Sequence, residues 1–423
     1  MPSLRLVAAV LIVLTSSFDI FLVIEAGANF RIGQLFVMML MALAIARTIQ
    51  HSDIPTLGLT PLLAWLAIQI VFIPTTTFWP KSVGYCFWLA LNIGLVFSFV
   101  QLFSENGRAL HSLLRWYLYS FGIVAAFGLV QFALPLAGLP APLVTQWWVR
   151  DRIPRLNGFS YEPSYYAAYL LIGFVLCGSL RNSEFRLLAP GRMRALHWLI
   201  GFSIVLSSSR LGVSFLLLDV LLRGRIRSWR AVARFSLAGA TIAAAVVLFA
   251  RTRPEAAIML LAGTGIYGTA AHSVVERANS FADTLTVFAQ HPFIGRSLGG
   301  VSSGIAELHG AKIRSFQDSK LYEGMAIFAE VLAASGVLGV VPFVVFLIVI
   351  IKKPLEAARR SSPEYSILLR ALTRSLVFEL AVLQFNQNIL RPYLWVHIAI
   401  LAAVYAAARP LTDVRGSVAD CGV

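Results

Sequence analysis

The sequence predicts an all-α membrane protein that crosses the bilayer about twelve times. Of its 423 residues, 58% are hydrophobic and only 13% are charged, whereas a soluble domain carries about 25% charged residues. A spanning helix needs roughly 20 apolar residues. The apolar segments are residues 4–24, 30–50, 57–73, 82–103, 112–134, 164–180, 194–208, 210–222, 232–250, 325–351, 366–386 and 391–408.

The shortest and the first of these segments need separate interpretations. Residues 194–208 and 210–222 are short, so they form either one broken helix or two tilted helices. The first segment follows Met1-Pro-Ser-Leu-Arg5 and resembles a signal sequence, but it lacks a small-residue cleavage site. We therefore expect a retained first helix. The whole chain, 1–423, then forms a single integral membrane domain.

The positions of the basic residues predict the orientation of the chain. Lys and Arg concentrate in cytoplasmic loops, and a cytoplasmic amino terminus places the basic loops 104–115, 181–193, 223–234 and 352–374 on that side. Both termini are then cytoplasmic, with 409–423 as a short cytoplasmic tail. These loops account for most of the net charge of +15, which therefore does not indicate nucleic-acid binding.

Other basic residues fall in two long segments on the predicted outer side, 135–163 and a large extracytoplasmic loop at 251–324. Long segments are translocated regardless of charge, so these residues do not contradict the orientation. Each one alone is compatible with a solvated loop, but together they favour an anionic ligand at the outer face. They are Arg150, Arg152, Arg155, Arg251, Arg253, Arg277, Arg296, Lys312, Arg314 and Lys320.

The passage 150–167 places many polar side chains between two long apolar segments. Glu162, Pro163 and Ser164 suit the amino terminus of a helix. That interpretation leaves the neighbouring arginines and tyrosines unexplained. Arginine can grip a phosphate at two points, and tyrosines at a membrane interface can support sugar rings. The predicted substrate-binding residues here are Arg152, Arg155, Tyr161, Tyr165 and Tyr166.

The passage Leu206-Ser-Ser-Ser-Arg210-Leu-Gly212 separates the two short apolar segments. Its arginine either snorkels to the interface or belongs to a helix break. Irregular backbone at membrane depth usually lines a cavity, so Arg210 is a candidate site residue.

Residues 274–290 predict an amphipathic helix that lies on the membrane. Arg277 opens this helix, and His291-Pro292 closes it. A lone histidine at such a turn is more often structural than catalytic. Further along, Tyr322 and Glu323 precede the next apolar segment.

The remaining residue types exclude several kinds of site. Cys86, Cys177 and Cys421 have no metal or disulfide spacing, and the histidines show no zinc motif. No phosphate-binding loop is present. We therefore expect no metal and no cofactor. Acids predicted inside membrane helices are candidates for function by default; they are Asp19, Glu330 and Glu379. Because no partner for them is evident in the sequence, we expect them to support helix packing or the site.

Three elements follow one another between about residues 150 and 340: Arg155-Leu-Asn-Gly158-Phe-Ser-Tyr-Glu162-Pro-Ser164, Ser209-Arg210-Leu-Gly212, and Arg277 leading to His291-Pro-Phe-Ile-Gly295. In this order they resemble the family of bacterial O-antigen polymerases and O-antigen ligases, whose architecture is similar to that of GT-C glycosyltransferases. The ligase branch usually carries a His-Asn pair before the helix that follows the large loop. Here that region reads Tyr322-Glu323-Gly-Met325, without histidine, which favours a polymerase.

The resemblance implies a metal-independent glycosyltransferase in the bacterial cytoplasmic membrane, with its active site facing outward. Such an enzyme joins oligosaccharide units carried on undecaprenyl diphosphate into a surface or secreted polysaccharide. A flippase and a chain-length regulator of the pathway are possible partners. By motif match, Arg210 and Arg277 would grip the diphosphate, followed by Arg155. Glu162 is the predicted general base and His291 the second choice. Arg296, Tyr322 and Glu323 complete the predicted substrate contacts.

Two alternatives stay open. A ligase would transfer the finished polymer from the lipid carrier to an acceptor. A non-enzymatic flippase or transporter of lipid-linked sugars would show charged residues along a central path and internal symmetry, and neither is evident in the sequence.

Overall fold

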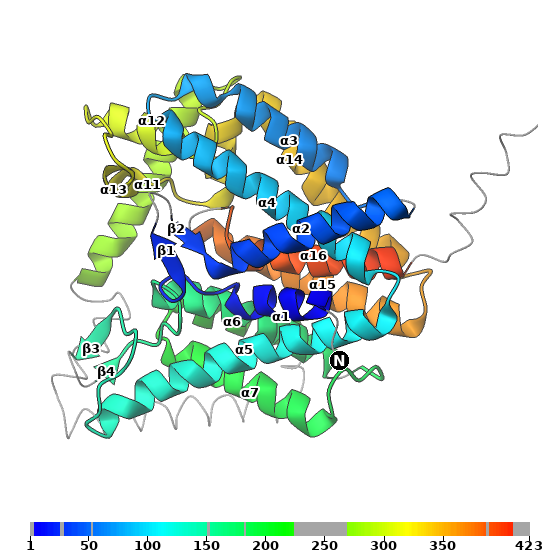
Figure 1. The fold of residues 1–423 in the computed structure, drawn as a ribbon. Helices are drawn as coiled ribbons and strands as arrows, with labels where there is room; N and C mark the ends of the chain where they lie inside the picture. The colour runs from blue at the N-terminus through cyan, green and yellow to red at the C-terminus, as the bar shows by residue number, and fades with distance from the viewer. Residues whose placement is uncertain are drawn as a thin grey trace, which may run out of the picture.

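The computed structural model describes residues 4–25, 29–51, 54–149, 153–181, 183–223, 269–385 and 389–408. In these residues the protein is a bundle of α-helices with two very short antiparallel hairpins (Figure 1). Strands β1 (Val23–Glu25) and β2 (Asn29–Arg31) form one hairpin, and β3 (Trp147–Val149) and β4 (Ile153–Pro154) form the other. The predicted helical class is confirmed.

Within the described residues, five helices are long and apolar enough to cross a membrane. This supports a membrane protein. They are α2 (Ile32–Gln50), α4 (Trp79–Phe103), α5 (Gly107–Leu136), α6 (Pro163–Leu180) and α14 (Ile327–Ala357). Shorter apolar helices are α1 (Leu4–Thr15), α3 (Leu59–Val71) and α16 (Pro392–Ala407).

The predicted number of twelve spans is not confirmed. Segment 232–250 and residues 251–268 of the predicted large loop lie outside the described residues. Helices α7 (Pro190–Leu206) and α8 (Arg210–Leu222) have 17 and 13 residues, which is short for a span. Helix α15 (Pro363–Val382) is continuous but carries the charged residues Arg370, Arg374 and Glu379.

Helices α6 and α16 form the centre of the bundle. Helix α6 packs against α15, α7 and α8, and α16 packs against α4 and α15. Of the 18 residues of α6, 89% are buried inside the protein, because its small and aromatic residues face neighbours on every side. Glu379 of α15 bonds His397 of α16 (Oε2 to Nδ1, 2.7 Å) in this core.

The first helix is shorter than predicted. We expected residues 4–24 to form a span that contains Asp19, but α1 ends at Thr15. Beyond it the backbone N–H of Asp19 donates to the carbonyl of Phe159 (2.9 Å), so the chain pairs with the loop before α6 instead of continuing as a helix. Asp19 therefore lies at the end of the bundle and not inside a helix.

The predicted break between the two short segments is present. Helix α7 ends at Leu206, Ser208 adopts a positive φ of 52°, and α8 begins at Arg210. The Ser209 hydroxyl accepts a hydrogen bond from the backbone N–H of Gly212 (3.3 Å), which caps the new helix. The serines thus provide a turn and a cap, and they place Arg210 at the first position of α8.

Helix α14 is also interrupted, at Gly336, whose φ is 58°. The chain that follows α11 (Thr269–Gln290) fills this break by pairing its backbone with that of α14. Ser297 donates to the carbonyl of Ala334 (2.8 Å), and Val337 donates to that of Pro292 (2.8 Å). The His-Pro-Phe-Ile-Gly segment therefore fastens the end of α11 to the bundle.

The docked segment approaches α14 so closely that Gly295→Ala should destabilise the protein. A Cβ at Gly295 would overlap the backbone of Ala334, and overpacking of this kind costs about 1–3 kcal/mol. We expect a lower midpoint of thermal unfolding in detergent. Gly84→Ala is the matched control, because nothing lies within 4 Å of the added Cβ and alanine favours a helix. Equal midpoints for the two variants would contradict the tight docking.

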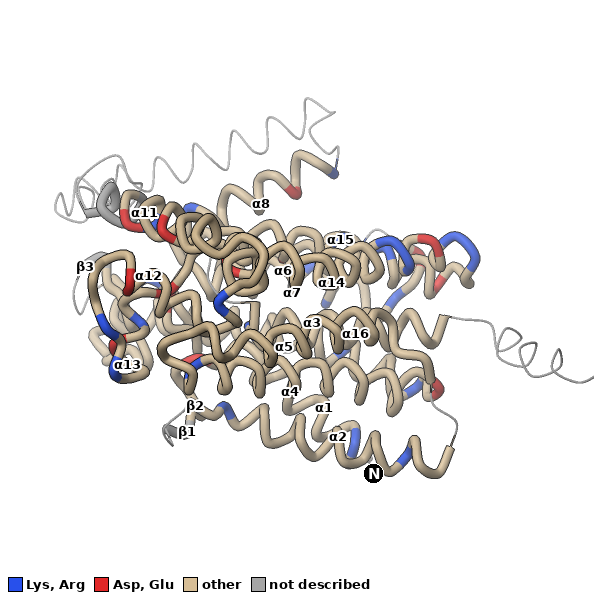
Figure 2. The backbone as a smooth tube through the Cα atoms, turned by 90° about the horizontal axis from the view of Figure 1, so that it is seen from above, with Lys and Arg blue, Asp and Glu red and all other residues tan. Residues whose placement is uncertain are grey.

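Charged residues gather mainly toward the two ends of the bundle, with a largely uncharged middle (Figure 2). Helix α1 begins and α16 ends at one end, whereas the hairpins, α11, α12 (Val301–Leu308) and α13 (Phe316–Ser319) lie at the other (Figure 1). We call the latter the hairpin end. That this end faces outward from the cytoplasmic membrane stays a prediction.

Candidate functional site

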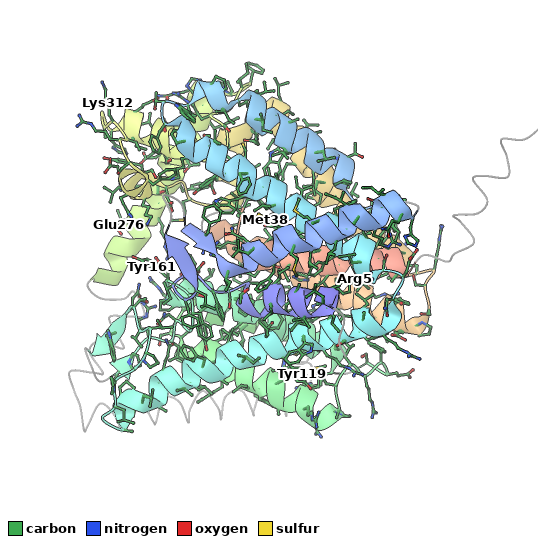
Figure 3. The ribbon with its side chains drawn as sticks, viewed as in Figure 1. Arg5, Met38, Tyr119, Tyr161, Glu276 and Lys312 are labelled. Carbon is green, nitrogen blue, oxygen red and sulfur yellow. The ribbon has the colours of Figure 1, made fainter. Side chains whose placement is uncertain are left out.

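Two of the predicted catalytic residues meet at the hairpin end. Glu162 precedes α6, and Arg277 lies in α11; the Glu162 Oε2 and Arg277 Nη2 atoms are 3.9 Å apart. The Ser164 hydroxyl donates to the same Oε2 (2.9 Å). Figure 3 labels their sequence neighbours, Tyr161 and Glu276, close together at this end. The contact joins segments more than a hundred residues apart in sequence.

Arg155 and Arg210 complete this group. Arg155 Nη2 donates to the carbonyl of Ser208 (3.4 Å), in the break just before Arg210. Burial lowers the pKa of Arg155, and Glu162 opposes this shift. Arg210 and Arg277 lower the pKa further, because they are positive charges within reach. We call Arg155, Arg210, Arg277 and Glu162 the arginine cluster.

The arginine cluster is positively charged and open to a ligand. The cluster contains three guanidinium groups and one carboxylate, so positive charge is in excess. Arg210 is exposed, and the Arg277 side chain keeps 43% of its surface. Arg155 is fixed by a bond from Nη1 to Gln146 Oε1 (2.8 Å). The group can therefore accept an anion that carries several oxygens.

A second charged group lies at the same end and was not predicted as a site. Asp19 Oδ1 accepts from Arg31 Nη2 (2.8 Å), and Asp19 Oδ2 pairs with Arg391 Nη1 (3.0 Å). The Arg391 guanidinium also stacks 3.8 Å from the ring centre of Tyr165. Tyr165, predicted to bind substrate, is thus a buried partner of Arg391 that lies one turn from Glu162 in α6.

A third polar group contains the predicted Glu323. Its Oε1 atom lies 3.6 Å from Nζ of Lys81, a buried lysine that was not predicted as a site residue. Lys81, Glu323 and Glu330 line a cavity of about 10 Å³, enough for roughly one water molecule. Glu330, which had no evident partner in the sequence, therefore faces this lysine across a small polar cavity. The remaining lining residues are Tyr85, Gly299, Val301, Ser302 and Gly324.

The tyrosines predicted to bind substrate have different surroundings. Tyr161 is 63% exposed at the hairpin end and remains available to a ligand. Tyr166 is fully buried, packed against Gly128 and Gly158. Its ring is part of the helix packing in this structure, and its binding of substrate stays a prediction. Adjacent tyrosines in a helix face different directions, so a run of tyrosines in the sequence does not show which rings reach the surface.

Other predicted residues are not in the arginine cluster. His291 lies fourteen positions after Arg277, about 20 Å along the axis of α11 and its end; burial and the nearby Arg296 lower its pKa. Arg296 is held by Glu307 (Nη2 to Oε2, 2.6 Å) and the Thr75 carbonyl (2.9 Å). The Tyr322 ring lies 6.4 Å from that of His309. Arg152 lies outside the described residues.

Comparison of the chain with protein-family models, curated proteins and solved structures gives no match. Within the described part of the chain, no group of three or more His, Cys, Asp or Glu side chains is placed to hold a metal ion. The candidate site therefore rests on the geometry of the arginine cluster.

Proposed function

We propose that the protein is a membrane glycosyltransferase that polymerises oligosaccharide units carried on a lipid diphosphate. One observation carries the proposal: Arg277 pairs with Glu162, and Arg155 and Arg210 lie near this pair, at one end of an apolar helical bundle. Such a site suits a substrate with a polyanionic group at the membrane surface and a lipid tail in the bilayer. The motif resemblance identifies undecaprenyl diphosphate as the expected carrier.

The reaction needs stabilisation of the leaving group more than it needs a cofactor. A hydroxyl of one unit attacks the anomeric carbon of the other chain. The new glycosidic bond forms as the bond from carbon to diphosphate oxygen breaks, and that oxygen keeps the electron pair. Negative charge builds on the diphosphate, where Arg210 and Arg277 would oppose it. Arg155 donates hydrogen bonds to Gln146 and to the carbonyl of Ser208 before α8. These bonds would hold its guanidinium in position beside the diphosphate.

Glu162 is the proposed acceptor of the hydroxyl proton. Its Oε2 atom already accepts from Ser164 and faces Arg277, so the carboxylate is oriented towards the cluster. The lipid carrier supplies the driving force, since it leaves as a diphosphate.

Glu162→Gln should abolish long glycan chains while the protein still reaches the membrane. Glutamine keeps the shape and cannot take the proton, and loss of general-base catalysis typically costs about 10²–10⁴-fold in rate. The measurement is the chain-length ladder on a gel, with membrane levels of the protein by immunoblot. Glu184→Gln, an exposed position beyond the far end of α6, serves as the control. A normal ladder from Glu162→Gln would remove Glu162 from the mechanism.

A deletion strain tests the function itself. Analysis of its lipid-linked glycans should show single repeat units accumulating on the outer side of the membrane. Long unattached chains would instead support a ligase, and units retained on the inner side would support a flippase.

A further inference from the structure

A larger cavity lies at the other end of α6 and α8 from the arginine cluster. It has a volume of about 450 Å³, within the range of small-molecule sites. Glu162 directly precedes α6, and Arg210 is the first residue of α8. Gly178 lies in the last turn of α6, and Leu222 lies in the last turn of α8. The 13 residues of α8 span about 20 Å. The cavity is lined by Gly178, Ser179, Ser183, Leu222, Arg223, Ile367, Arg370, Ala371 and Arg374.

The arginines of this cavity are arranged around a buried carboxylate. Asp219 is fully buried and accepts from Arg223 Nε (2.7 Å) and from Arg374 Nη2 (3.0 Å). Arg223 Nη2 also donates to the carbonyl of Val175 (2.7 Å). A Cβ at Gly178 would overlap the Arg223 guanidinium, so glycine is required there for this arginine to reach the cavity.

Internal pairing does not use all the donors or all the charge of these arginines. Asp219 pairs with Arg223 and Arg374, and Arg370 also lines the cavity, so positive charge is in excess among these described residues. The Arg374 Nε atom is buried and has no hydrogen-bond partner within the described residues. A buried donor without a partner is costly, and an anion in the cavity would satisfy it.

We propose that this cavity binds a phosphate group, carried either by an anionic phospholipid headgroup or by a free phosphate. Arginine donors match phosphate oxygens in pairs, and basic pockets between membrane helices bind lipid headgroups. Leu222, Ile367 and Ala371 add apolar surface beside the arginines, as a lipid would require. Because the site is far from the arginine cluster, it does not depend on the proposed polymerase activity.

Native mass spectrometry of the full-length protein in detergent tests the proposal, with phosphatidylglycerol as one probe and phosphatidylcholine for comparison. A separate titration with inorganic phosphate, followed by calorimetry, tests the free anion. Arg370→Gln/Arg374→Gln should weaken binding by about tenfold to a hundredfold. Arg370→Gln alone should weaken phosphate or lipid binding less than the double substitution. Because Arg370 is at an exposed position, this variant should fold normally. Thermal unfolding of each variant checks that it is folded.

The control is Arg359→Gln/Arg360→Gln, which removes the same charge from exposed residues between α14 and α15. Selective, arginine-dependent retention of phosphatidylglycerol would support the site with a lipid as the source. Arginine-dependent binding of inorganic phosphate without lipid retention would support it with a free phosphate. Absence of binding by the native protein, or equal binding by the cavity and control variants, would overturn the proposal.

Discussion

Arg277→Ala should reduce glycan polymerisation by about 10²–10³-fold without removing the protein from the membrane. The substitution takes away a guanidinium that faces Glu162 at 3.9 Å and belongs to the positive group at the hairpin end. Loss of one positioned donor to a developing negative charge costs about 2.7–4 kcal/mol of transition-state stabilisation. The rate is measured from the disappearance of purified lipid-linked repeat units in reconstituted vesicles.

Two further variants separate charge from geometry. Arg277→Lys keeps the charge but loses the paired donors, so we expect activity between those of the native protein and the alanine variant. Arg210→Ala should show a loss similar to that of Arg277→Ala. Arg314→Ala, an exposed arginine of the predicted outer loop, should retain native activity. If Arg314→Ala and Arg277→Ala were equally active, the arginine cluster would have no role in the reaction.

Three of the four members of the arginine cluster could be singled out in the sequence because they lie beside an apolar segment, where a charged side chain is costly unless it pairs or binds a ligand. Arg155 and Glu162 flank a helix start, Arg210 follows a run of serines, and Arg277 is in an amphipathic helix. The order of the apolar segments indicated that these positions are on the same side of the membrane. The structure pairs Arg277 with Glu162 and places Arg155 against the helix break that precedes Arg210.

The other two charged groups could not be predicted because their pairs join distant parts of the chain. Asp19 and Arg391 are 372 positions apart, and Lys81 pairs with Glu323. In the sequence, Lys81 and Arg391 each precede an apolar segment, where a positive charge is expected simply as an interfacial flank. Only the folded bundle shows that both cations are buried and paired.

Part of the motif resemblance has a structural explanation. His291-Pro-Phe-Ile-Gly295 docks into the break of α14 at Gly336 by backbone hydrogen bonds. The glycines at both positions allow two backbones to approach closely. Spacing alone could not distinguish this role from catalysis, because a turn and a site residue produce the same short pattern of His, Pro and Gly.

Asp19→Ala should destabilise the protein by about 3–5 kcal/mol, because removing one member of a buried ionic group leaves its partners unpaired. The Asp19 and Arg391 side chains are each only 10% exposed, and Arg31 shares the same carboxylate. The three residues join the start of α2 and the start of α16 to the chain after α1. Unfolding in detergent, followed by circular dichroism, measures the loss. Glu356→Ala, which breaks a surface pair with Lys353, should change stability by less than about 1 kcal/mol.

The asymmetry of the group gives the sharper test. Arg391→Met leaves Asp19 paired with Arg31, so it should cost less than Asp19→Ala, which leaves Arg391 and the partly exposed Arg31 without their acid. In Asp19→Ala/Arg391→Met the most buried unpaired cation is gone, and an apolar side chain takes its place beside Tyr165. The double variant should therefore be more stable than the sum of the single losses predicts, by about 0.5–3 kcal/mol. Strict additivity would mean that the two side chains do not interact, contrary to their 3.0 Å contact.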